Sequence, residues 1–270
     1  MKIESLFSVR DLSVMITGGA SGIGLAIAEA FAGNGARVTI ADVNQAAIAD
    51  QLPRLQQFGA VHAVEMDITD KASVEAGMKN GAAANGGIDV LFANAGADAG
   101  SWFLDMQGQR IPGGEAENFD EEDWDKVIAI NLTGVMRSAK AVIPYMKAKG
   151  GRIIVTTSIA ALMVSPAASL AYFPSKAGAA HLVRRLALEL ARYNILVNAI
   201  APGGVVTNIA DGIWRNEAML RATERAVPLH RVAQPEDLQG VALFLASRAS
   251  SYITGREIVV DGGMTLGMAD

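Results

Sequence analysis

Short runs of apolar residues alternate with longer, alanine-rich segments along most of the chain. The short runs predict β-strands at residues 12–17, 37–41, 61–65, 89–92, 152–157, 195–200 and 257–260. The longer segments predict helices at 24–34, 44–58, 73–85, 123–147, 172–193 and 235–245, the fourth being bent or broken at Pro144. The strands are apolar throughout, as expected when both faces of a sheet are covered. This order predicts an α/β, doubly wound fold of about seven parallel strands with helices on both faces.

The alternation runs without an internal repeat, a low-complexity tract or a linker, so we expect one domain over residues 1–270. Ligands of such sheets bind beyond the carboxyl ends of the strands. The expected site therefore lies near Thr17, Asp42, Asp67, Asn94, Ser158 and Pro202. Two segments that follow strand ends, 97–122 and 204–227, are long for plain connections, and we expect them to form an extended loop and a substrate lid.

Composition excludes several classes of protein. With 51% hydrophobic and 19% charged residues, the chain is too apolar to be disordered. A net charge of −5 argues against nucleic acid as a partner. The absence of cysteine excludes disulfides and thiolate nucleophiles and fits a reducing compartment. Charged residues interrupt every long apolar run, Glu4 and Arg10 among them, so we expect a cytoplasmic protein without a membrane span.

A glycine-rich turn follows the first predicted strand and opens the first predicted helix. It includes Gly18, Gly22 and Gly24 in the spacing G-x-x-x-G-x-G. Glycines in this context let backbone N–H groups approach a diphosphate at the start of a helix. No lysine follows the glycines as a Walker-type ATP site requires, so that kind of site is rejected, and a glycine turn taken alone could equally be structural.

Asp42 ends the second predicted strand, where a carboxylate can accept the ribose hydroxyls of an adenosine. A carboxylate would repel a 2′-phosphate, and neither the glycine turn nor Val43 offers a basic side chain to bind one. We therefore expect NAD rather than NADP. Asp42 could instead be the N-cap of the next helix.

Further motifs occur in one order along nearly the whole chain. They are Thr17-Gly18-x-x-x-Gly22-x-Gly24, Asn94-Ala95-Gly96, Asn131, Ser158, Tyr172-x-x-x-Lys176 and Pro202-Gly203-Gly204-Val205-Val206-Thr207. Their order and separations resemble the short, single-domain branch of the short-chain dehydrogenase/reductase family. The resemblance implies a Rossmann-type fold and an oxidoreductase acting on an alcohol or ketone. It also implies a homo-oligomer, expected as a tetramer, because relatives pair through their long helices.

The resemblance assigns catalytic roles to Asn131, Ser158, Tyr172 and Lys176. Tyr172 and Lys176 are spaced i, i+4, so a helix places them on one face. The pKa of a phenol is about 10 and must fall by about 3 units for the group to act near neutral pH. One cation in a partly dry cleft lowers the pKa by about that much. We therefore expect Lys176 to lower the pKa of Tyr172. In the family pattern Ser158 hydrogen-bonds the substrate oxygen, and Asn131 holds a water in a proton relay.

The same resemblance implies the cofactor contacts. The expected residues are Gly18, Ser21, Gly22, Ile23, Gly24, Asp42, Asp67, Ile68, Asn94, Ala95, Gly96, Tyr172, Lys176, Pro202, Gly203, Val205 and Thr207. The chain departs from the family pattern in its long 97–122 segment, in Leu196, where relatives often carry Arg, and in Pro174 between Tyr172 and Lys176. None of these departures changes the catalytic positions.

Other chemistries find little support. His62, His181 and His230 are not spaced as metal ligands. The acidic residues 120–123 precede a predicted helix, where they complement its dipole, so they are not interpreted as a metal site. We therefore expect no metal. No G-x-S-x-G elbow is present for a serine hydrolase. The alternatives left open are a polyol, sugar or 3-oxoacyl dehydrogenase/reductase of the same family, a sugar epimerase or dehydratase of the superfamily, and a dinucleotide-sensing regulator without turnover.

The segments expected to wall the substrate pocket are 97–111, 160–169 and 204–220. Their large apolar residues are Trp102, Phe103, Leu162, Met163, Val164, Ile209, Ile213, Trp214 and Met219. Their charged residues are Asp98, Asp105, Arg110, Asp211, Arg215 and Glu217. An apolar wall gains about 25 cal/mol per Å² of apolar ligand surface and does not replace the water lost from sugar hydroxyls. We therefore expect a bulky, largely apolar secondary alcohol or ketone, aromatic or alicyclic, beneath a lid.

Overall fold

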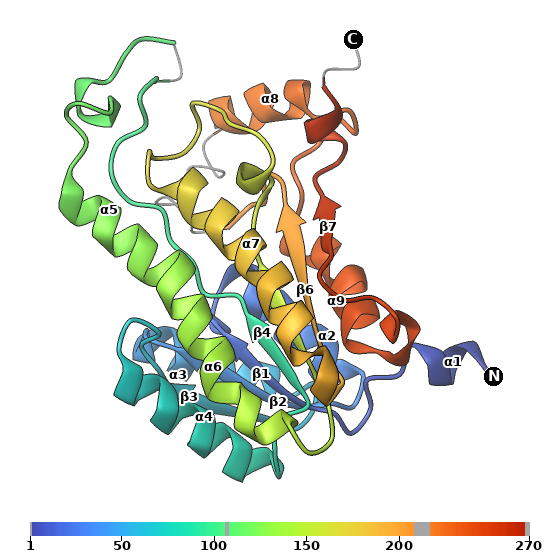
Figure 1. Ribbon diagram of the computed structural model, residues 1–270. Helices are drawn as coiled ribbons and strands as arrows, with labels where there is room; N and C mark the ends of the chain where they lie inside the picture. The colour runs from blue at the N-terminus through green and yellow to red at the C-terminus, as the bar shows by residue number, and fades with distance from the viewer. Residues whose placement is uncertain (1, 106–107, 208–216, 268–270) are drawn as a thin grey trace.

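The computed structural model describes residues 2–105, 108–207 and 217–267 (Figure 1). Its centre is a parallel sheet of seven strands in the order β3-β2-β1-β4-β5-β6-β7. The strands are β1 (Ser13–Thr17), β2 (Arg37–Asp42), β3 (Val61–Glu65), β4 (Val90–Ala93), β5 (Gly151–Thr156), β6 (Ile195–Pro202) and β7 (Glu257–Val260). The predicted strands and the α/β fold class are confirmed. The strand order reverses between β1 and β4, the point at which such sheets bind ligands.

Helices cover both faces of the sheet, and each face has its own hydrophobic core (Figure 1). Helices α2 (Gly22–Gly33), α3 (Gln45–Leu55) and α9 (Gln239–Ala246) pack on one face. Helices α4 (Lys71–Asn85), α6 (Val135–Met146) and α7 (Tyr172–Leu190) pack on the other. The two cores hold the strands at fixed separations, so the loops at the carboxyl ends of the strands start from fixed positions.

The predicted helix at 123–147 is interrupted, but not at Pro144. It consists of α5 (Glu121–Ile128), a π-helical turn (Ala129–Gly134) and α6, which contains Pro144. Pro144 lies in the last turn of α6, where its missing N–H removes only one helical hydrogen bond. Asp120 caps α5 by accepting a hydrogen bond from the N–H of Glu122 at 2.8 Å, so the acidic run does start a helix.

The continuous helical stretch Glu121–Met146 is long and apolar enough to cross a membrane by length and composition alone. It instead packs through α6 against α4, β4 and β5. It also begins with a turn that holds three acidic residues. Part of its apolar surface is therefore buried in the core of the protein.

Two helices were not predicted. Helix α1 (Ile3–Leu6) has no buried residue, and Phe7, which follows it, contacts Phe244 with ring centroids 6.3 Å apart. Helix α8 (Glu217–Ala226) lies within the segment expected to be a lid. Figure 1 shows α8 above the carboxyl ends of the strands, on the same side as the loop that precedes α5. Residues 208–216 of the expected lid lie outside the described part of the chain.

Candidate active site

The glycine turn between β1 and α2 is tightly packed. Gly18 and Gly22 have φ values of +64° and +50°, which favour glycine. A Cβ atom on Gly24 would overlap the carbonyl oxygen of Gly18 and lie 2.6 Å from Nδ2 of Asn94. The turn therefore needs glycine at these positions, and these glycines carry no side chain that would keep a ligand away from the backbone. This cradle at the start of α2 fits a dinucleotide diphosphate.

Asn94 joins the ends of three neighbouring strands. Its Nδ2 donates to the carbonyl oxygens of Thr17 and Gly18 at 3.1 and 3.3 Å. Its Oδ1 accepts from the hydroxyl of Thr156 at 3.0 Å. Thr17 in turn accepts the backbone N–H groups of Asn94 and Ala95 through its hydroxyl oxygen. The ends of β1, β4 and β5 are thereby fixed relative to one another directly beneath the site.

Ser158, Tyr172 and Lys176 meet at the carboxyl end of β5. The side chains of Ser158 and Tyr172 are hydrogen-bonded, and Ser158 Oγ also accepts the N–H of Ala160 at 3.1 Å. Lys176 is 3% exposed, its Nζ donates to the Thr156 carbonyl at 3.1 Å, and it lies 5.6 Å from the centroid of the Tyr172 ring. Pro174 lies in the first turn of α7, where it removes no helical hydrogen bond.

Burial governs the protonation of this pair. The pKa of Tyr172 is raised to about 12, mainly because the phenol is buried; the hydrogen bond from Ser158 lowers this pKa, and the charge of Asp98 contributes to raising it. Burial also lowers the pKa of Lys176 to about 8. The expectation that Lys176 lowers the pKa of Tyr172 is therefore not met by the protein alone. The loss of water around the phenol outweighs the nearby ammonium group.

Asn131 lies behind these residues, completely buried in the π-helical turn. Its Oδ1 accepts the N–H of Ala97 at 2.9 Å. Its Nδ2 donates to the Ala97 carbonyl at 2.8 Å and to Ser175 Oγ at 3.1 Å. Ser175 donates to the Tyr172 carbonyl at 2.7 Å. The Asn131 side chain thus connects the loop after β4 to the start of α7.

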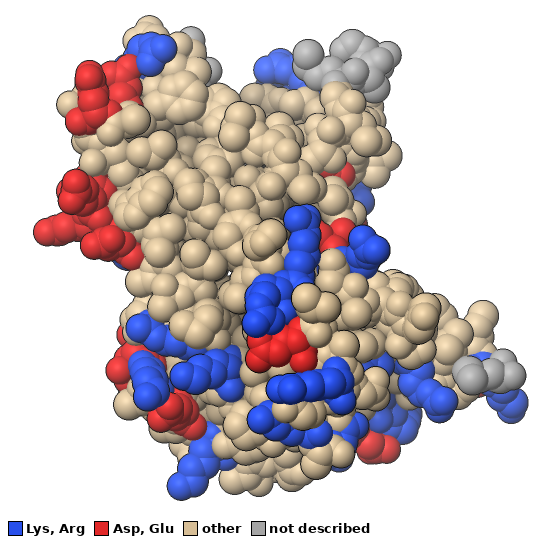
Figure 2. Space-filling model, viewed as in Figure 1, with Lys and Arg blue, Asp and Glu red and all other residues tan. Residues whose placement is uncertain are grey.

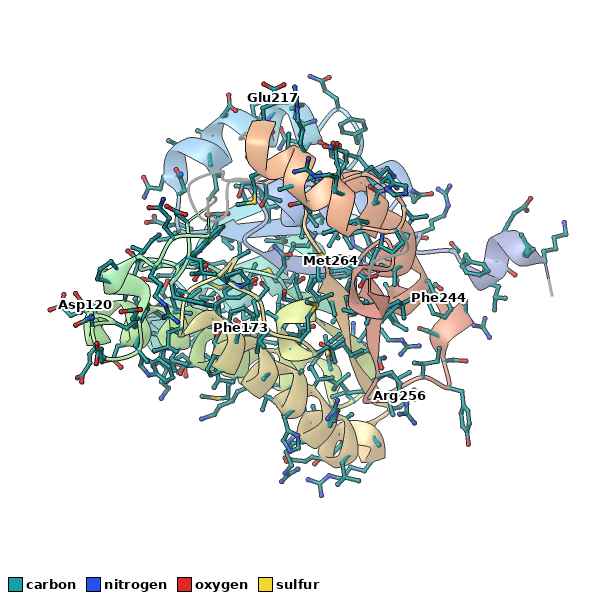
Figure 3. All side chains as sticks on the ribbon, turned by 90° about the horizontal axis from the view of Figure 1, so that it is seen from above. Asp120, Phe173, Glu217, Phe244, Arg256 and Met264 are labelled. Carbon is teal, nitrogen blue, oxygen red and sulfur yellow. The ribbon has the colours of Figure 1, made fainter. Side chains whose placement is uncertain are left out.

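A cavity of about 440 Å³ opens in front of these groups. Its cofactor side is lined by Gly18, Ser21, Gly22, Ile23, Asn94, Ala95, Gly96, Pro202, Gly203, Val205 and Thr207, all of them predicted contacts. Its other wall includes Ser158, Tyr172 and Lys176 together with Trp102, Ile159, Met163, Phe173 and Met264. Figure 3 shows Phe173 and Met264 toward the middle of the view from above, with Asp120 and Glu217 at its periphery. The structure therefore brings most of the predicted site together in one cavity.

Some predicted cofactor residues lie outside this cavity. Asp42 accepts the N–H groups of Ala20 at 3.1 Å and Asn44 at 3.0 Å, one on each carboxylate oxygen. Asn44 is the N-cap of α3, so the N-cap alternative for Asp42 is wrong. Asp67 accepts two hydrogen bonds from Thr69, and Ile68 packs close to Gly134. Both follow the carboxyl end of β3, farther along the edge of the sheet.

Only some of the residues expected in the substrate walls line this cavity. Trp102 and Met163 line the cavity, whereas Phe103, Leu162 and Val164 are exposed and do not. Met219 is buried away from the cavity lining, and Ile209, Ile213 and Trp214 lie outside the described residues. Phe173 and Met264 line the cavity but were not predicted. Phe173 follows Tyr172 directly in the sequence, and this position could have marked it.

Two polar residues of the site were also missed. Ser175 lies within the Tyr-x-x-Ser-Lys stretch and is completely buried. Asp98 was counted only among the charges of the long loop, yet it lines the cavity and bonds to Ser169. Its position two residues after the Asn-Ala-Gly turn places it beside the strand end and could have marked it.

Comparisons with known proteins agree with this geometry. The family model described as enoyl-(acyl carrier protein) reductase matches residues 18–265. Oxidoreductase UcpA of Salmonella typhimurium is 40% identical over 266 residues, which cover 94% of each chain. The cis-4-hydroxycyclohexanecarboxylate dehydrogenase of Sinomonas cyclohexanicum is 39% identical over 254 residues, covering 93% of this chain and 95% of that protein.

A solved structure is similar over almost the same length. The gluconate 5-dehydrogenase of Burkholderia cenocepacia, in complex with NADP and tartrate, superposes with a TM-score of 0.87 at 29% identity. The match covers 98% of this chain and 99% of that one. With the parallel sheet, the glycine turn and the Ser158–Tyr172–Lys176 cluster on the same scaffold, this chain belongs to the short-chain dehydrogenase/reductase family and is an oxidoreductase.

Proposed function

We propose that the protein is an NAD-dependent oxidoreductase that interconverts a secondary alcohol and its ketone, with a bulky, largely apolar, alicyclic or aromatic substrate. One observation carries the proposal: the cavity sets Ser158, Tyr172 and Lys176 against the side chains of Trp102, Met163, Phe173 and Met264. The polar groups suit the reacting oxygen, and the apolar wall suits the rest of a hydrophobic molecule.

The polar residues of the cavity and those behind it have different roles in the proposed reaction. Ser158 and Tyr172, hydrogen-bonded to each other, are placed to bind the substrate oxygen, and the phenol moves the proton. Lys176 holds its ammonium group between the tyrosine ring and the Thr156 carbonyl. Asn131 and Ser175 fix the start of α7, which carries the phenol. An oxidised nicotinamide bound in this cavity would supply the hydride acceptor and a positive charge that favours the phenolate.

Asp42 supports the choice of NAD. Each of its carboxylate oxygens accepts one backbone N–H, which leaves acceptor capacity for ribose hydroxyls. The next residue, Val43, is 63% exposed and brings no positive charge to a 2′-phosphate. A phosphate placed against Asp42 would meet like charge.

We expect the unmodified protein to prefer NAD over NADP by at least tenfold in kcat/KM, because repulsion of a 2′-phosphate acts only on NADP. Asp42→Asn removes the charge and keeps an acceptor for the two backbone N–H groups, and it should lower the preference. Adding Val43→Arg should lower it further. Initial rates with both cofactors measure this. Equal kcat/KM values in the unmodified protein would refute the role given to Asp42.

The test of the substrate class is a rate comparison at saturating NAD. We expect cyclohexanol derivatives and 1-arylethanols to exceed sorbitol and a 3-hydroxyacyl thioester in kcat/KM, because the wall described above gains from apolar surface. A polar substrate that wins by more than tenfold would favour the polyol, sugar or acyl alternative and leave the oxidoreductase assignment in place. Binding of NAD without oxidation of any alcohol would favour a dinucleotide-sensing regulator.

Two further features remain proposals. We propose a homotetramer in the cytoplasm. An exposed face of α7 supports the assembly, because Leu188 is 80% exposed there. Strand β7 also forms an open edge of the sheet. Figure 2 shows acidic side chains gathered on the side of α5, basic ones lower on the molecule, and a broad uncharged area between them. Sedimentation velocity measures the assembly.

A further inference from the structure

One acid lies in the otherwise uncharged substrate side of the cavity. Asp98 follows the turn after β4 and lines the same cavity as Ser158, Tyr172 and Phe173. Among the described residues that line this cavity, Asp98 is the only carboxylate, and Lys176 is the only other residue that carries a full charge. The acid therefore lies where the part of a substrate beyond its reacting oxygen would be bound.

The contacts of Asp98 fix its position without neutralising it. Its Oδ1 accepts the hydroxyl of Ser169 at 2.5 Å. Its Oδ2 has long contacts with the N–H of Ser169 at 3.3 Å and with Nε1 of Trp102 at 3.4 Å, and the backbone N–H of Ala99 also donates to the carboxylate. In the described part of the chain, no Lys, Arg or His forms an ion pair with it. A carboxylate oxygen with weak partners keeps the capacity to accept a further hydrogen bond.

The charge of Asp98 extends to the reacting groups. It raises the pKa of Tyr172 and the pKa of Lys176, so the three groups are close enough to interact. Burial raises the pKa of Asp98 itself, and its hydrogen bonds from Ser169 and Trp102 oppose this. The negative charge of Asp98 would therefore repel an anionic ligand in this cavity, as it disfavours the phenolate form of Tyr172.

We propose that Asp98 determines the charge of the substrate: it rejects molecules that carry an anionic group on the part beyond the reacting carbon and accepts a hydroxyl or ammonium group in its place. The proposal rests on the proposed function, since it takes this cavity as the substrate site. Two like charges about 6 Å apart at an effective dielectric of about 20 correspond to roughly a hundredfold in affinity, before screening by salt. A discrimination of at least tenfold is therefore expected.

The decisive comparison uses two compounds of the same shape. They are cis-4-hydroxycyclohexanecarboxylate, which the Sinomonas relative takes according to its name, and the carboxamide of the same ring. We expect kcat/KM for the carboxamide to exceed that for the carboxylate by at least tenfold. In Asp98→Asn the ratio should fall to within threefold, because the variant keeps the size and the acceptor but loses the charge.

Ser169→Ala is the matched control. It removes the strongest partner of Asp98 and keeps the carboxylate, so the tenfold ratio should persist. If both variants lose the ratio equally, Asp98 acts only by bracing the loop against Ser169, and the proposal is overturned. Thermal unfolding of both variants shows whether either has lost its fold.

A binding measurement separates this proposal from the proposed function. Calorimetry with cyclohexanecarboxylate and cyclohexanecarboxamide, in the presence of NADH, requires no turnover. Weaker binding of the carboxylate, relieved in Asp98→Asn, supports the role of Asp98 even if no alcohol is oxidised. Equal binding of the two probes, or no binding of either at tens of millimolar, overturns it. Turnover of both compounds at equal rates would overturn the role of Asp98 while the oxidoreductase function stands.

Discussion

Tyr172→Phe is expected to lower kcat by at least a hundredfold on the best alcohol of the substrate panel. The substitution removes only the phenol oxygen, which is hydrogen-bonded to Ser158 and is proposed to move the proton. Loss of a general acid or base costs about 10²–10⁴ in rate. The glycine turn, which is proposed to hold the diphosphate, is untouched. The dissociation constant for NADH should therefore stay within threefold.

The measurements are stopped-flow rates of NADH formation and fluorescence titration with NADH. Tyr252→Phe serves as the matched control, because Tyr252 is fully exposed and the same atom is removed there. The control should retain full activity. If the Tyr172 variant keeps a rate within tenfold of the unmodified protein, another group moves the proton and the assignment fails.

Gly24→Ala is expected to weaken cofactor binding by at least tenfold and to lower the melting temperature. The new Cβ would overlap the Gly18 carbonyl and press on Asn94. Asn94 bonds the ends of β1 and β5, so the strain extends to the floor of the site. Overpacking costs about 1–3 kcal/mol, and each kcal/mol lowers Tm by about 2–4 °C in a protein of this size.

Gly33→Ala provides the comparison within the same helix. A Cβ on Gly33 meets no atom within 4 Å. Alanine in a helix is favoured over glycine by about 0.5–1 kcal/mol, so this variant should be as stable as the unmodified protein or slightly more stable. Thermal unfolding and NADH titration of both variants test the pair. Equal behaviour would show that the turn relaxes without harm and that its glycines have no special role.

The strands and the glycine turn could be predicted because their signals are local. Strands β1 and β4 are short apolar runs, and Gly18 to Gly24 follow one of them directly. The Asn94 motif and the i, i+4 spacing of Tyr172 and Lys176 are equally local, and a helix or a turn converts such spacing into proximity. The positions of these site residues could therefore be predicted from the sequence alone.

What could not be predicted depends on contacts between distant segments. The π-helical turn at Ala129–Gly134 has no marker in its own sequence, but it directs Asn131 toward Ala97. Exposure of Leu162 and Val164 follows from the path of the loop that carries them. The raised pKa of Tyr172 results from burial by the whole fold, which a charge argument about one lysine did not include.

The hydrogen bonds of Asn131 to Ala97 also divide the long loop after β4 into two parts. The first part, up to Asp98, is held in place and is called the root; the part that follows Asp98 is called the tip. The root ends at Asp98, which is bound to Ser169. The tip closes mainly on itself, through the bridge of Leu104 with Arg110 and the ion pair of Arg110 with Glu115 at 2.8 Å. Insertions or deletions in the tip would leave the reacting groups in place. A lineage could thus acquire new substrates by replacing this tip alone, without rebuilding its catalytic machinery.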